Sequence, residues 1–462
     1  MVVGVAGFLT LLQRMAGSRT RAVAAVGAAF GFGFIAPLVW WMNAVSSGAY
    51  VGIILSQIGF FALLAVCLRR VMRLPFWPLW GAAVWVGVEY FRGSFPFSGF
   101  PWGRLAHTGI DTPFAPYVRL IGTPGTSAVM FLAAAAIAYA ARGQKAKRVV
   151  VAVVSVFALM GLGAMLPTGI AGAQGTRQVA LVQGDVPGLF GTWPPGEIFQ
   201  KHVVETEKLI ADIAAGKQLK PDFVLWPENS TDVDPVQDTD EDRTIRELST
   251  SLRAPILVGG IFNGPTRETA YNAGVVWDED GPGERYVKRK LVPYGEYVPF
   301  RSELGSFVPR FDRQIPRDML PGKKSGVLDS AGVTIGDTIC WDIAYDGNIR
   351  DNILGGAQLL VVQTSNASFS GTSQPDQQWK ISRLRAIETG RYVLVPSTNG
   401  ISGIVDPKGR TVARATPHTP ATLSAKVRLA QGTTTGVRSG GIIESALVTL
   451  GLVGLILGRK RN

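Results

Sequence analysis

Charged residues are scarce in this 462-residue chain: Asp, Glu, Lys and Arg make up 17% of it, whereas 47% is hydrophobic. A soluble chain would carry about a quarter charged residues, so the composition favours a membrane protein with one sizeable folded domain. Cysteine and histidine are scarcer still. Two cysteines, Cys67 and Cys340, exclude a disulfide framework. The three histidines are too far apart in sequence for a His-rich metal site, and we expect neither metal nor cofactor.

The net charge of +12 belongs to four short basic clusters rather than to one basic face. The clusters are Arg14, Arg19 and Arg21; Arg69, Arg70 and Arg73; Arg142, Lys145, Lys147 and Arg148; and Arg459, Lys460 and Arg461. Without these residues the chain is close to neutral. No surface for nucleic acid is therefore expected.

Long uncharged runs lie between the basic clusters. Residues 22–68 contain no charged residue and suffice for two spans of about 20 residues each. Further candidate spans are residues 74–91, 124–141, 149–166 and 441–458. The first twelve residues are apolar but too short to span, which is typical of a first helix that is either shortened or begun at too late a start codon. Membrane helices are thus expected within residues 1–168 and at residues 441–458.

The basic clusters fall at every second loop, as the positive-inside rule expects of cytoplasmic loops. This alternation predicts that residues 177–438 lie outside the cytoplasm. Residues 93–112 also face the outer side and are too rich in aromatic residues, proline and glycine to form a helix. They suit either an interfacial aromatic belt or a loop that contacts lipid.

The outer segment, residues 177–438, is long enough for one large core. Short β-rich runs are expected at residues 178–186, 223–226, 256–262, 273–277, 333–340, 359–363, 392–396 and 403–405. Helices are expected around the apolar stripe from Phe199 to Ile213 and at residues 374–389, whereas residues 231–242 suit an exposed loop. The pattern predicts an α/β domain or a layered sandwich with helices outside.

Three segments place a reactive residue at the end of an apolar strand or beside a tight turn. Glu228 follows the run 223–226, Lys288 lies in 286–299, and Cys340 follows a strand-like run. Each also has an ordinary structural interpretation: a helix-capping carboxylate, a solvated lysine, or a buried core thiol. With so few histidines, however, a carboxylate is the expected base for a cysteine nucleophile, and a lysine can stabilise developing negative charge. The three side chains form a chemically sufficient set.

In this order, the three segments resemble the Glu–Lys–Cys triad of the nitrilase superfamily of carbon–nitrogen hydrolases. The pattern Tyr286-x-Lys288-x-x-Leu291 selects Lys288 over Lys290. The continuation from Leu291 to Pro299 is similar to the integral membrane branch, the apolipoprotein N-acyltransferases. Other segments that agree are Phe97-Ser-Gly-Phe-Pro-Trp102, Val182-Gln-Gly184, Arg385-Ala-Ile-Glu-Thr-Gly-Arg391 and Asn399-Gly-Ile-Ser402.

This resemblance implies several membrane helices and an extracytoplasmic α-β-β-α sandwich in the cytoplasmic membrane of a bacterium. Cys340 would take an acyl chain from a phospholipid as a thioester, Glu228 would carry the proton, and Lys288 would stabilise the oxyanion. The acceptor would be the N-terminal amine of a diacylated apolipoprotein. Glu296 matches a second acidic position of the family.

Three further segments are less closely matched to the family. Trp193 is a candidate for a tryptophan on a loop over the site, although the loop length differs. Trp341 and Asp342 stand where the family usually has Tyr-Glu, so they are expected to support the site. Asn366-Ala-Ser-Phe369 replaces the usual Asn-Asp-x-Trp. The resemblance therefore does not predict which residues line the acyl or acceptor groove.

Two other functions remain as alternatives. A membrane-anchored nitrilase or amidase would use the same triad with water as acceptor, but it needs one anchor rather than several spans. A transporter or receptor would need polar residues within the spans, and the candidate spans hold few besides Glu89 and Glu444 near their ends.

Overall fold

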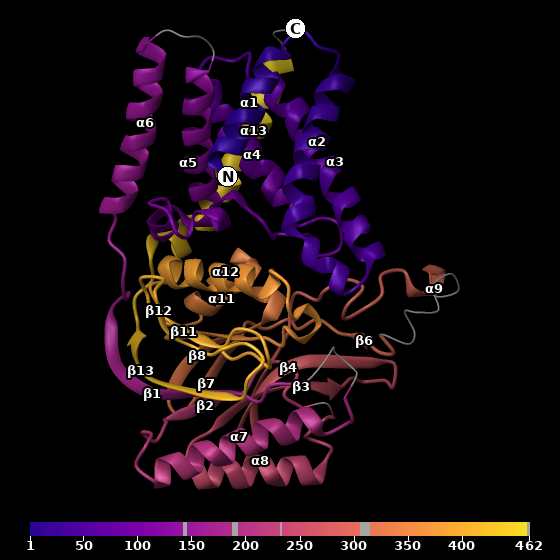
Figure 1. Ribbon diagram of the computed structural model, residues 1–462, viewed down its shortest axis with the longest axis vertical. Coiled ribbons are helices and arrows are strands. Elements are labelled where there is room, and N and C mark those ends of the chain that lie inside the picture. Colours follow the sequence, from indigo (N-terminus) through magenta and orange to yellow (C-terminus); the bar gives the residue numbers. More distant parts are fainter. Residues whose placement is uncertain (142–145, 187–192, 232, 305–314, 460–462) are drawn as a thin grey trace. The chain divides into compact units, whose positions relative to one another are not determined.

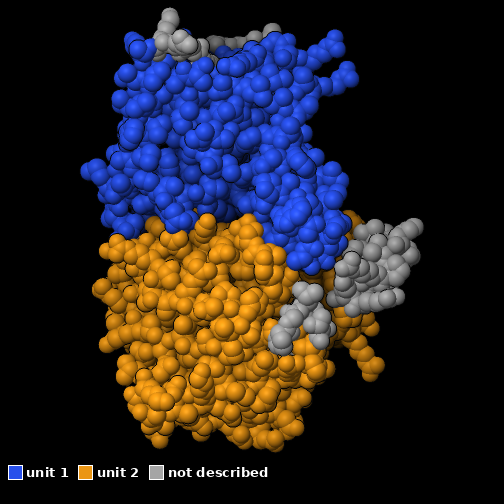
Figure 2. Space-filling model, in the orientation of Figure 1, with its two compact units in different colours: residues 1–168, 434–462 blue, residues 169–433 orange. Residues whose placement is uncertain are grey.

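The computed structural model describes residues 1–141, 146–186, 193–231, 233–304 and 315–459. Of the basic clusters, Arg142, Lys145, Lys460 and Arg461 lie outside the described residues. The chain forms two compact units, residues 1–168 with 434–462 and residues 169–433 (Figure 2).

The first unit is helical. Its elements are α1 (Val2–Arg14), α2 (Thr20–Leu38), η1 (Trp40–Ala44), α3 (Ser47–Val71), α4 (Trp77–Arg92), η2 (Leu105–Gly109), η3 (Ala115–Tyr117), α5 (Val118–Ala140), α6 (Ala146–Met165) and α13 (Thr435–Arg459). Within the described part of the chain, five helices are long and apolar enough to cross a membrane: Thr20–Leu38, Ser47–Val71, Ala115–Ala140, Ala146–Met165 and Thr435–Arg459. The expectation of several apolar helices on both sides of a folded domain is confirmed.

The span expected at residues 74–91 is not among those five. Helix α4 has 16 residues, fewer than the roughly 20 that cross a bilayer at right angles. Pro78 lies in its first turn and Gly93 follows its last residue, and both residue types bound helices. Helix α1 is shorter still, with 13 residues.

Residues 93–112 fold back on α4 as turns and one short 3-10 helix, as their composition predicts. The buried Arg92 guanidinium donates to the carbonyls of Phe100 at 2.9 Å and Trp102 at 2.8 Å. The Glu89 carboxylate accepts from the Leu105 N–H at 2.7 Å. The two charged groups near the end of α4 thus satisfy the backbone of a segment that makes little regular structure.

The second unit contains two β-sheets packed face to face (Figure 1). One sheet has the order β13-β1-β2-β3-β4-β5, with β6 beside β4, and the other has the order β12-β11-β10-β9-β8-β7. The strands are β1 (Ala173–Gln183), β2 (Phe223–Leu225), β3 (Ile256–Asn263), β4 (Thr269–Asp278), β5 (Gly281–Val287), β6 (Asp318–Met319), β7 (Val327–Ser330), β8 (Val333–Ile339), β9 (Leu359–Gln363), β10 (Val393–Val395), β11 (Gly403–Val405), β12 (Thr411–Arg414) and β13 (Ala421–Ala430).

Helices cover the outer face of each sheet. Helices α7 (Glu197–Ala214) and α8 (Thr239–Leu252) lie on the first sheet, and α11 (Asp346–Leu354) and α12 (Gln374–Thr389) on the second (Figure 1). Short helices α9 (Arg301–Leu304), η4 (Cys340–Ala344) and η5 (Ala367–Phe369) complete the unit. The α-β-β-α sandwich predicted from the resemblance is confirmed.

Alternation along the strands builds two cores. Phe223 and Leu225 point between the sheets, whereas Val224 and Trp226 point toward α7 and α8, because neighbouring strand residues face opposite sides. The prediction of a loop over residues 231–242 is wrong at its end. Asp238 accepts from the N–H groups of residues 240 and 241 and thereby starts α8 at Thr239.

The central strands of both sheets run parallel. Strand β2 pairs in parallel with β1 and β3, and β9 pairs in parallel with β8 and β10. The carboxyl ends of parallel neighbours meet at one edge of a sheet, and α/β proteins mount functional groups there. Glu228 follows β2, and Cys340 follows β8 directly.

Candidate active site

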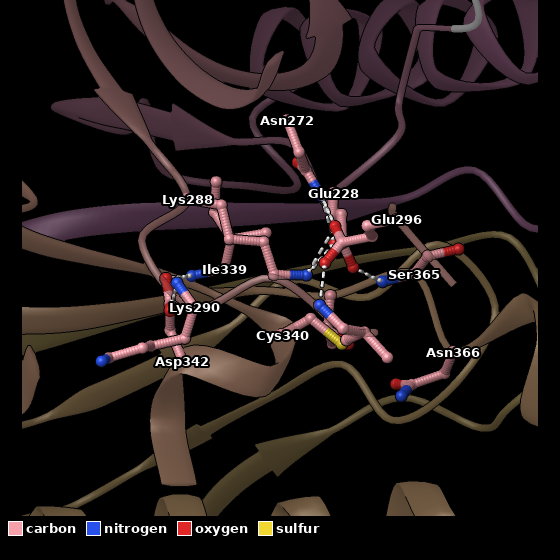
Figure 3. Close-up of polar contacts among 12 residues, drawn as sticks. Glu228, Asn272, Lys288, Lys290, Glu296, Ile339, Cys340, Asp342, Ser365 and Asn366 are labelled. Atoms are coloured by element: carbon pink, nitrogen blue, oxygen red, sulfur yellow. Dashed lines mark hydrogen bonds and ion pairs between the residues drawn. The ribbon is translucent and has the colours of Figure 1, made fainter. Parts of the chain in front are cut away.

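The structure brings Glu228, Lys288 and Cys340 together at this edge, with Glu296 beside them (Figure 3). Lys288 immediately follows β5 and is 1% exposed. Its Nζ lies 3.2 Å from Glu228 Oε1 and 2.9 Å from Glu296 Oε1. The ammonium group is therefore fixed by two carboxylates in a buried site.

Asn272 on β4 joins the same two carboxylates. Its Nδ2 lies 2.8 Å from both Glu228 Oε1 and Glu296 Oε1. The second oxygen of Glu228 accepts from the Ser365 N–H at 3.0 Å, and that of Glu296 accepts from the Val292 N–H at 2.8 Å. Every carboxylate oxygen of the pair thus has a donor, which fixes the direction of both side chains.

Charge and burial oppose each other in this cluster. Burial alone would lower the pKa of Lys288, but the charges of Glu228 and Glu296 outweigh it and hold that pKa well above its ordinary value. Lys288 is therefore a permanent cation. The chemistry open to it is electrostatic stabilisation of an anion rather than proton transfer.

Cys340 has a protonated thiol at neutral pH. Burial, together with the negative charge of Glu228, raises the pKa of Cys340 to about 12, while Lys288 and the Thr364 hydroxyl act in the opposite direction. Its φ of 49° is left-handed, a conformation that costs energy for a residue other than glycine and that clusters at active sites. A thiolate can form here only as a neighbouring group takes the proton.

Asp342 ties the turn after Cys340 to the segment that carries Lys288. It is fully buried, and it accepts from the Tyr286 hydroxyl at 2.5 Å and the Lys290 N–H at 2.9 Å. These two donors lie two residues before and two after Lys288. Burial raises the pKa of Asp342 above that of an ordinary Asp, although Tyr286 and Lys288 oppose the rise.

The remaining predicted residues are the two tryptophans, Trp341 and Trp193. Trp341 is 8% exposed, and its indole N–H donates to the Tyr345 hydroxyl at 2.9 Å. Trp193 is partly exposed ahead of α7, and residues 187–192 before it lie outside the described residues. A role for Trp193 over the site stays a prediction.

Sequence reasoning missed a set of amide side chains around the site. Besides Asn272, the Gln378 amide N–H donates to the Cys340 carbonyl at 3.3 Å, and Asn366 donates to Gln378 Oε1 at 2.9 Å. Asn366 thus belongs to the support beneath Cys340. A polar residue inside an otherwise apolar strand, as Asn272 is in β4, was the available signal.

The described residues contain no group of three or more His, Cys, Asp or Glu side chains able to hold a metal ion. The arrangement instead combines a thiol, a carboxylate that could act as a base, and a fixed cation. This set of groups is suited to covalent acyl transfer.

Comparison with known protein families identifies the class of the second unit. Residues 178–436 match the model of the carbon–nitrogen hydrolase family, and residues 1–136 match that of the apolipoprotein N-acyltransferase N-terminal domain. Yeast (Saccharomyces cerevisiae) Nit3, a solved member of branch 10 of the nitrilase superfamily, is 19% identical with a TM-score of 0.42, over 59% of this chain and 94% of Nit3. The second unit is a nitrilase-fold domain.

Two relatives cover nearly the whole chain. The apolipoprotein N-acyltransferase of Mycolicibacterium smegmatis is 34% identical over 94% of this chain and 77% of its own length. That of Gloeobacter violaceus is 28% identical over 91% of this chain and 80% of its own length. The chain belongs to the apolipoprotein N-acyltransferase family, and the resemblance inferred from its motifs is confirmed.

Proposed function

We propose that this protein transfers an acyl chain from a phospholipid, through a thioester on Cys340, to the N-terminal amine of the diacylglyceryl cysteine of apolipoproteins. The observation that carries the proposal is the buried cluster of Glu228, Lys288 and Glu296 beside Cys340, in a chain of this family. The same cluster would serve a hydrolase. The named relatives do not favour that alternative.

The first half-reaction loads the enzyme. Glu228 takes the thiol proton as the Cys340 sulfur attacks the ester carbonyl carbon, and the carbonyl electrons move onto oxygen. Lys288 stabilises this oxyanion. As the electrons return, the ester C–O bond breaks, and the leaving alcohol of the lysophospholipid receives the proton from Glu228.

The second half-reaction discharges the enzyme. The amine attacks the thioester carbonyl, Glu228 takes a proton from the nitrogen, and Lys288 again stabilises the oxyanion. The C–S bond breaks, and the sulfur regains the proton as the amide forms. An amide is far more stable than a thioester, so this step runs in one direction.

Four supporting positions and the surroundings complete the proposal. Glu296 holds Lys288, and Asp342 holds the turn that begins at the nucleophile. Trp341 supports that turn through its bond to Tyr345, and Trp193 contacts substrate. The apolar helices hold the protein in a bacterial cytoplasmic membrane, with the catalytic unit outside the cytoplasm. Phospholipid and diacylated apolipoprotein are then both within reach in the bilayer.

The decisive experiment follows the acyl chain by mass spectrometry. Wild-type protein incubated with phospholipid alone should gain one acyl mass on the Cys340 peptide, and hydroxylamine should release it. Adding an apolipoprotein peptide with a free N-terminus should discharge the enzyme and yield an amide.

Two variants serve as references. Cys340→Ala should neither load nor transfer, whereas Cys67→Ala removes the other cysteine and should load normally. Acyl mass on another residue, or peptide acylation without a loaded enzyme, would reject the thioester route. Release of free fatty acid in place of the amide would favour the hydrolase.

A further inference from the structure

A second polar cluster lies between the two sheets, and the mechanism above does not use it. Asp337 on β8 precedes Cys340 by three residues, and Gln363 ends β9, opposite Ile339. Both side chains are fully buried. They meet above Gly274 on β4, where an added Cβ would lie 2.4 Å from Asp337 Oδ2 and 2.3 Å from Gln363 Oε1. The absence of a side chain at Gly274 leaves the room that these two oxygens occupy.

The orientation of the Gln363 amide follows from its other contact. Its Nε2 lies 2.7 Å from the Trp226 carbonyl oxygen, which can only accept, so the NH₂ group faces Trp226 and the oxygen faces Asp337. Within the described part of the chain, Gln363 Oε1 and both Asp337 carboxyl oxygens have no hydrogen-bond partner. An ionised Asp337 would therefore place buried acceptors against each other with no proton between them, which is costly.

We propose that Asp337 is a neutral carboxylic acid whose O–H donates to Gln363 Oε1, and that this hydrogen bond positions the nucleophile's strand against the base's strand. Gln363 in turn donates to Trp226, two residues before Glu228. The chain of bonds from Asp337 to Trp226 thus joins β8, which ends directly before Cys340, to the residue that follows β2. Asp337 is a positioning residue, because it touches neither substrate nor the reacting atoms.

The surrounding charges favour the neutral form. Asp342 of η4 and Glu228 after β2 are the acidic groups that face Asp337, and Tyr286 of β5 is its other titratable neighbour. Burial, and then the charge of Asp342, hold the pKa of Asp337 well above that of an ordinary Asp. The nearby Thr338 N–H opposes this rise in part without making a hydrogen bond of standard geometry.

Neutrality at this position also matters for the thiol. Three acidic residues already surround Lys288, and negative charge raises the pKa of Cys340. A further carboxylate three residues from Cys340 would disfavour the thiolate still more. The hydrogen bond to Gln363 keeps Asp337 protonated and so prevents a further negative charge near Cys340.

Infrared difference spectroscopy of the full-length protein tests the proton directly. Wild type minus Asp337→Asn at neutral pH should show the carbonyl stretch of one protonated carboxylic acid. Asp329→Asn, which changes an exposed Asp on β7, should show none. Gln363→Met should move the band to higher frequency, because the acid loses its acceptor. A carboxylate bridged to Gln363 by water would give no such band, and that result would overturn the proposal.

Measurements of activity and stability test the positioning role of Asp337. Only the activity measurement, which follows acyl loading of Cys340, rests on the proposed function. Asp337→Asn keeps a donor for Gln363 and should load phospholipid acyl chains at close to the wild-type rate at neutral pH. Asp337→Leu leaves Gln363 Oε1 unsatisfied and should load about tenfold more slowly. Equal losses in both variants would contradict the hydrogen bond.

The pH dependence has a definite sign. Because the pKa of Asp337 is raised on folding, its favourable contribution is complete below its ordinary pKa of about 4 and is lost as pH rises through the folded pKa. Asparagine does not titrate, so the stability of Asp337→Asn relative to wild type should increase with pH above about 4. A constant difference would argue against a buried proton. If neither the wild type nor any variant takes up an acyl chain on Cys340 but the infrared band is present, the proposed function fails and this inference stands.

Discussion

At the scale of single residues, the reactivity of Cys340 depends on the charge of Lys288. The thiol has a pKa of about 12, and of the two groups that lower this pKa, Lys288 has the larger effect. Lys290, two residues along, has its ammonium over the Tyr345 ring at 5.2 Å and is not among the groups that shift this pKa. Substitution of Lys290 is therefore a matched control for substitution of Lys288.

We expect Lys288→Met to slow alkylation of Cys340 by iodoacetamide about tenfold at a fixed pH below the thiol pKa. Removing the cation raises the pKa of Cys340, so a smaller fraction is thiolate at any given pH. The rate should be measured against pH in a Cys67→Ala background, so that Cys340 is the only thiol.

Lys290→Met removes the same charge from a partly exposed position two residues further along and should leave the pH profile within about twofold of wild type. If both variants shift the profile equally, the effect is one of net charge and not of the buried contact. Faster alkylation in Lys288→Met would contradict the electrostatic role of Lys288.

The sequence allowed the three candidate catalytic residues to be predicted by two different signals. Glu228 and Cys340 each follow a strand with a recognisable apolar pattern, whereas Lys288 was selected by the motif Tyr286-x-Lys288-x-x-Leu291.

The sequence did not reveal Asn272 or the pairing of Asp337 with Gln363. Asn272 on β4 contacts Glu228 and Glu296, while Asp337 on β8 and Gln363 on β9 lie against Gly274 of β4. These segments are far apart in the sequence, and no local pattern specifies which of them will face each other.

At the scale of elements, prediction succeeded for buried strands and failed at the edges of the sheets. Residues 359–363 were predicted as a strand and form β9, whose residues are all buried. Strand β13 lies at an edge of its sheet and carries Thr, Ser, Lys and Arg among its apolar residues. Its mixed pattern reflects partial exposure and resembles that of a loop.

The short helix η4, which begins at Cys340, depends on a side chain from another element. Arg385 of α12 is fully buried and donates to the carbonyls of Ile343 at 3.0 Å and Ala344 at 3.1 Å. It also pairs with Asp346 at 2.7 Å and Glu388 at 2.6 Å. One guanidinium thus satisfies the end of η4 and two carboxylates.

Arg385→Met should destabilise the second unit by about 3 kcal/mol, because it leaves the buried Glu388 without its cation. Thermal unfolding of the purified protein measures this loss. Arg385→Met combined with Glu388→Met should recover part of it, since the second change removes the uncompensated charge. A double variant no more stable than Arg385→Met would show that the bonds to η4 dominate.

At the scale of the whole molecule, the predicted topology depends on α4. The alternation of basic clusters requires this helix to cross the membrane, although its 16 residues span only about 24 Å at about 1.5 Å per residue. Arg92 and Glu89 bind the following segment, so a crossing would be completed by residues 93–112 rather than by helix alone.

Reporter fusions test this directly. A reporter active only in the cytoplasm should be dark when fused after Thr112 or Pro417 and bright when fused after Arg73, within a basic cluster. A bright fusion after Thr112 would show that α4 does not cross. A bright fusion after Pro417 would place the second unit in the cytoplasm and contradict the proposed localisation.

The pairing of β1 with β13 has a mechanical consequence. The two strands are antiparallel, with Ala173 opposite Ala430, and the Gly432 N–H donates to the Ala171 carbonyl at 2.7 Å. Both chain connections of the second unit therefore leave from the same point. A force that pulled the two connections apart would load these hydrogen bonds one after another, as in opening a zipper, and would meet little resistance. A force on both connections together would not load the ladder at all, so the sheet would stay intact.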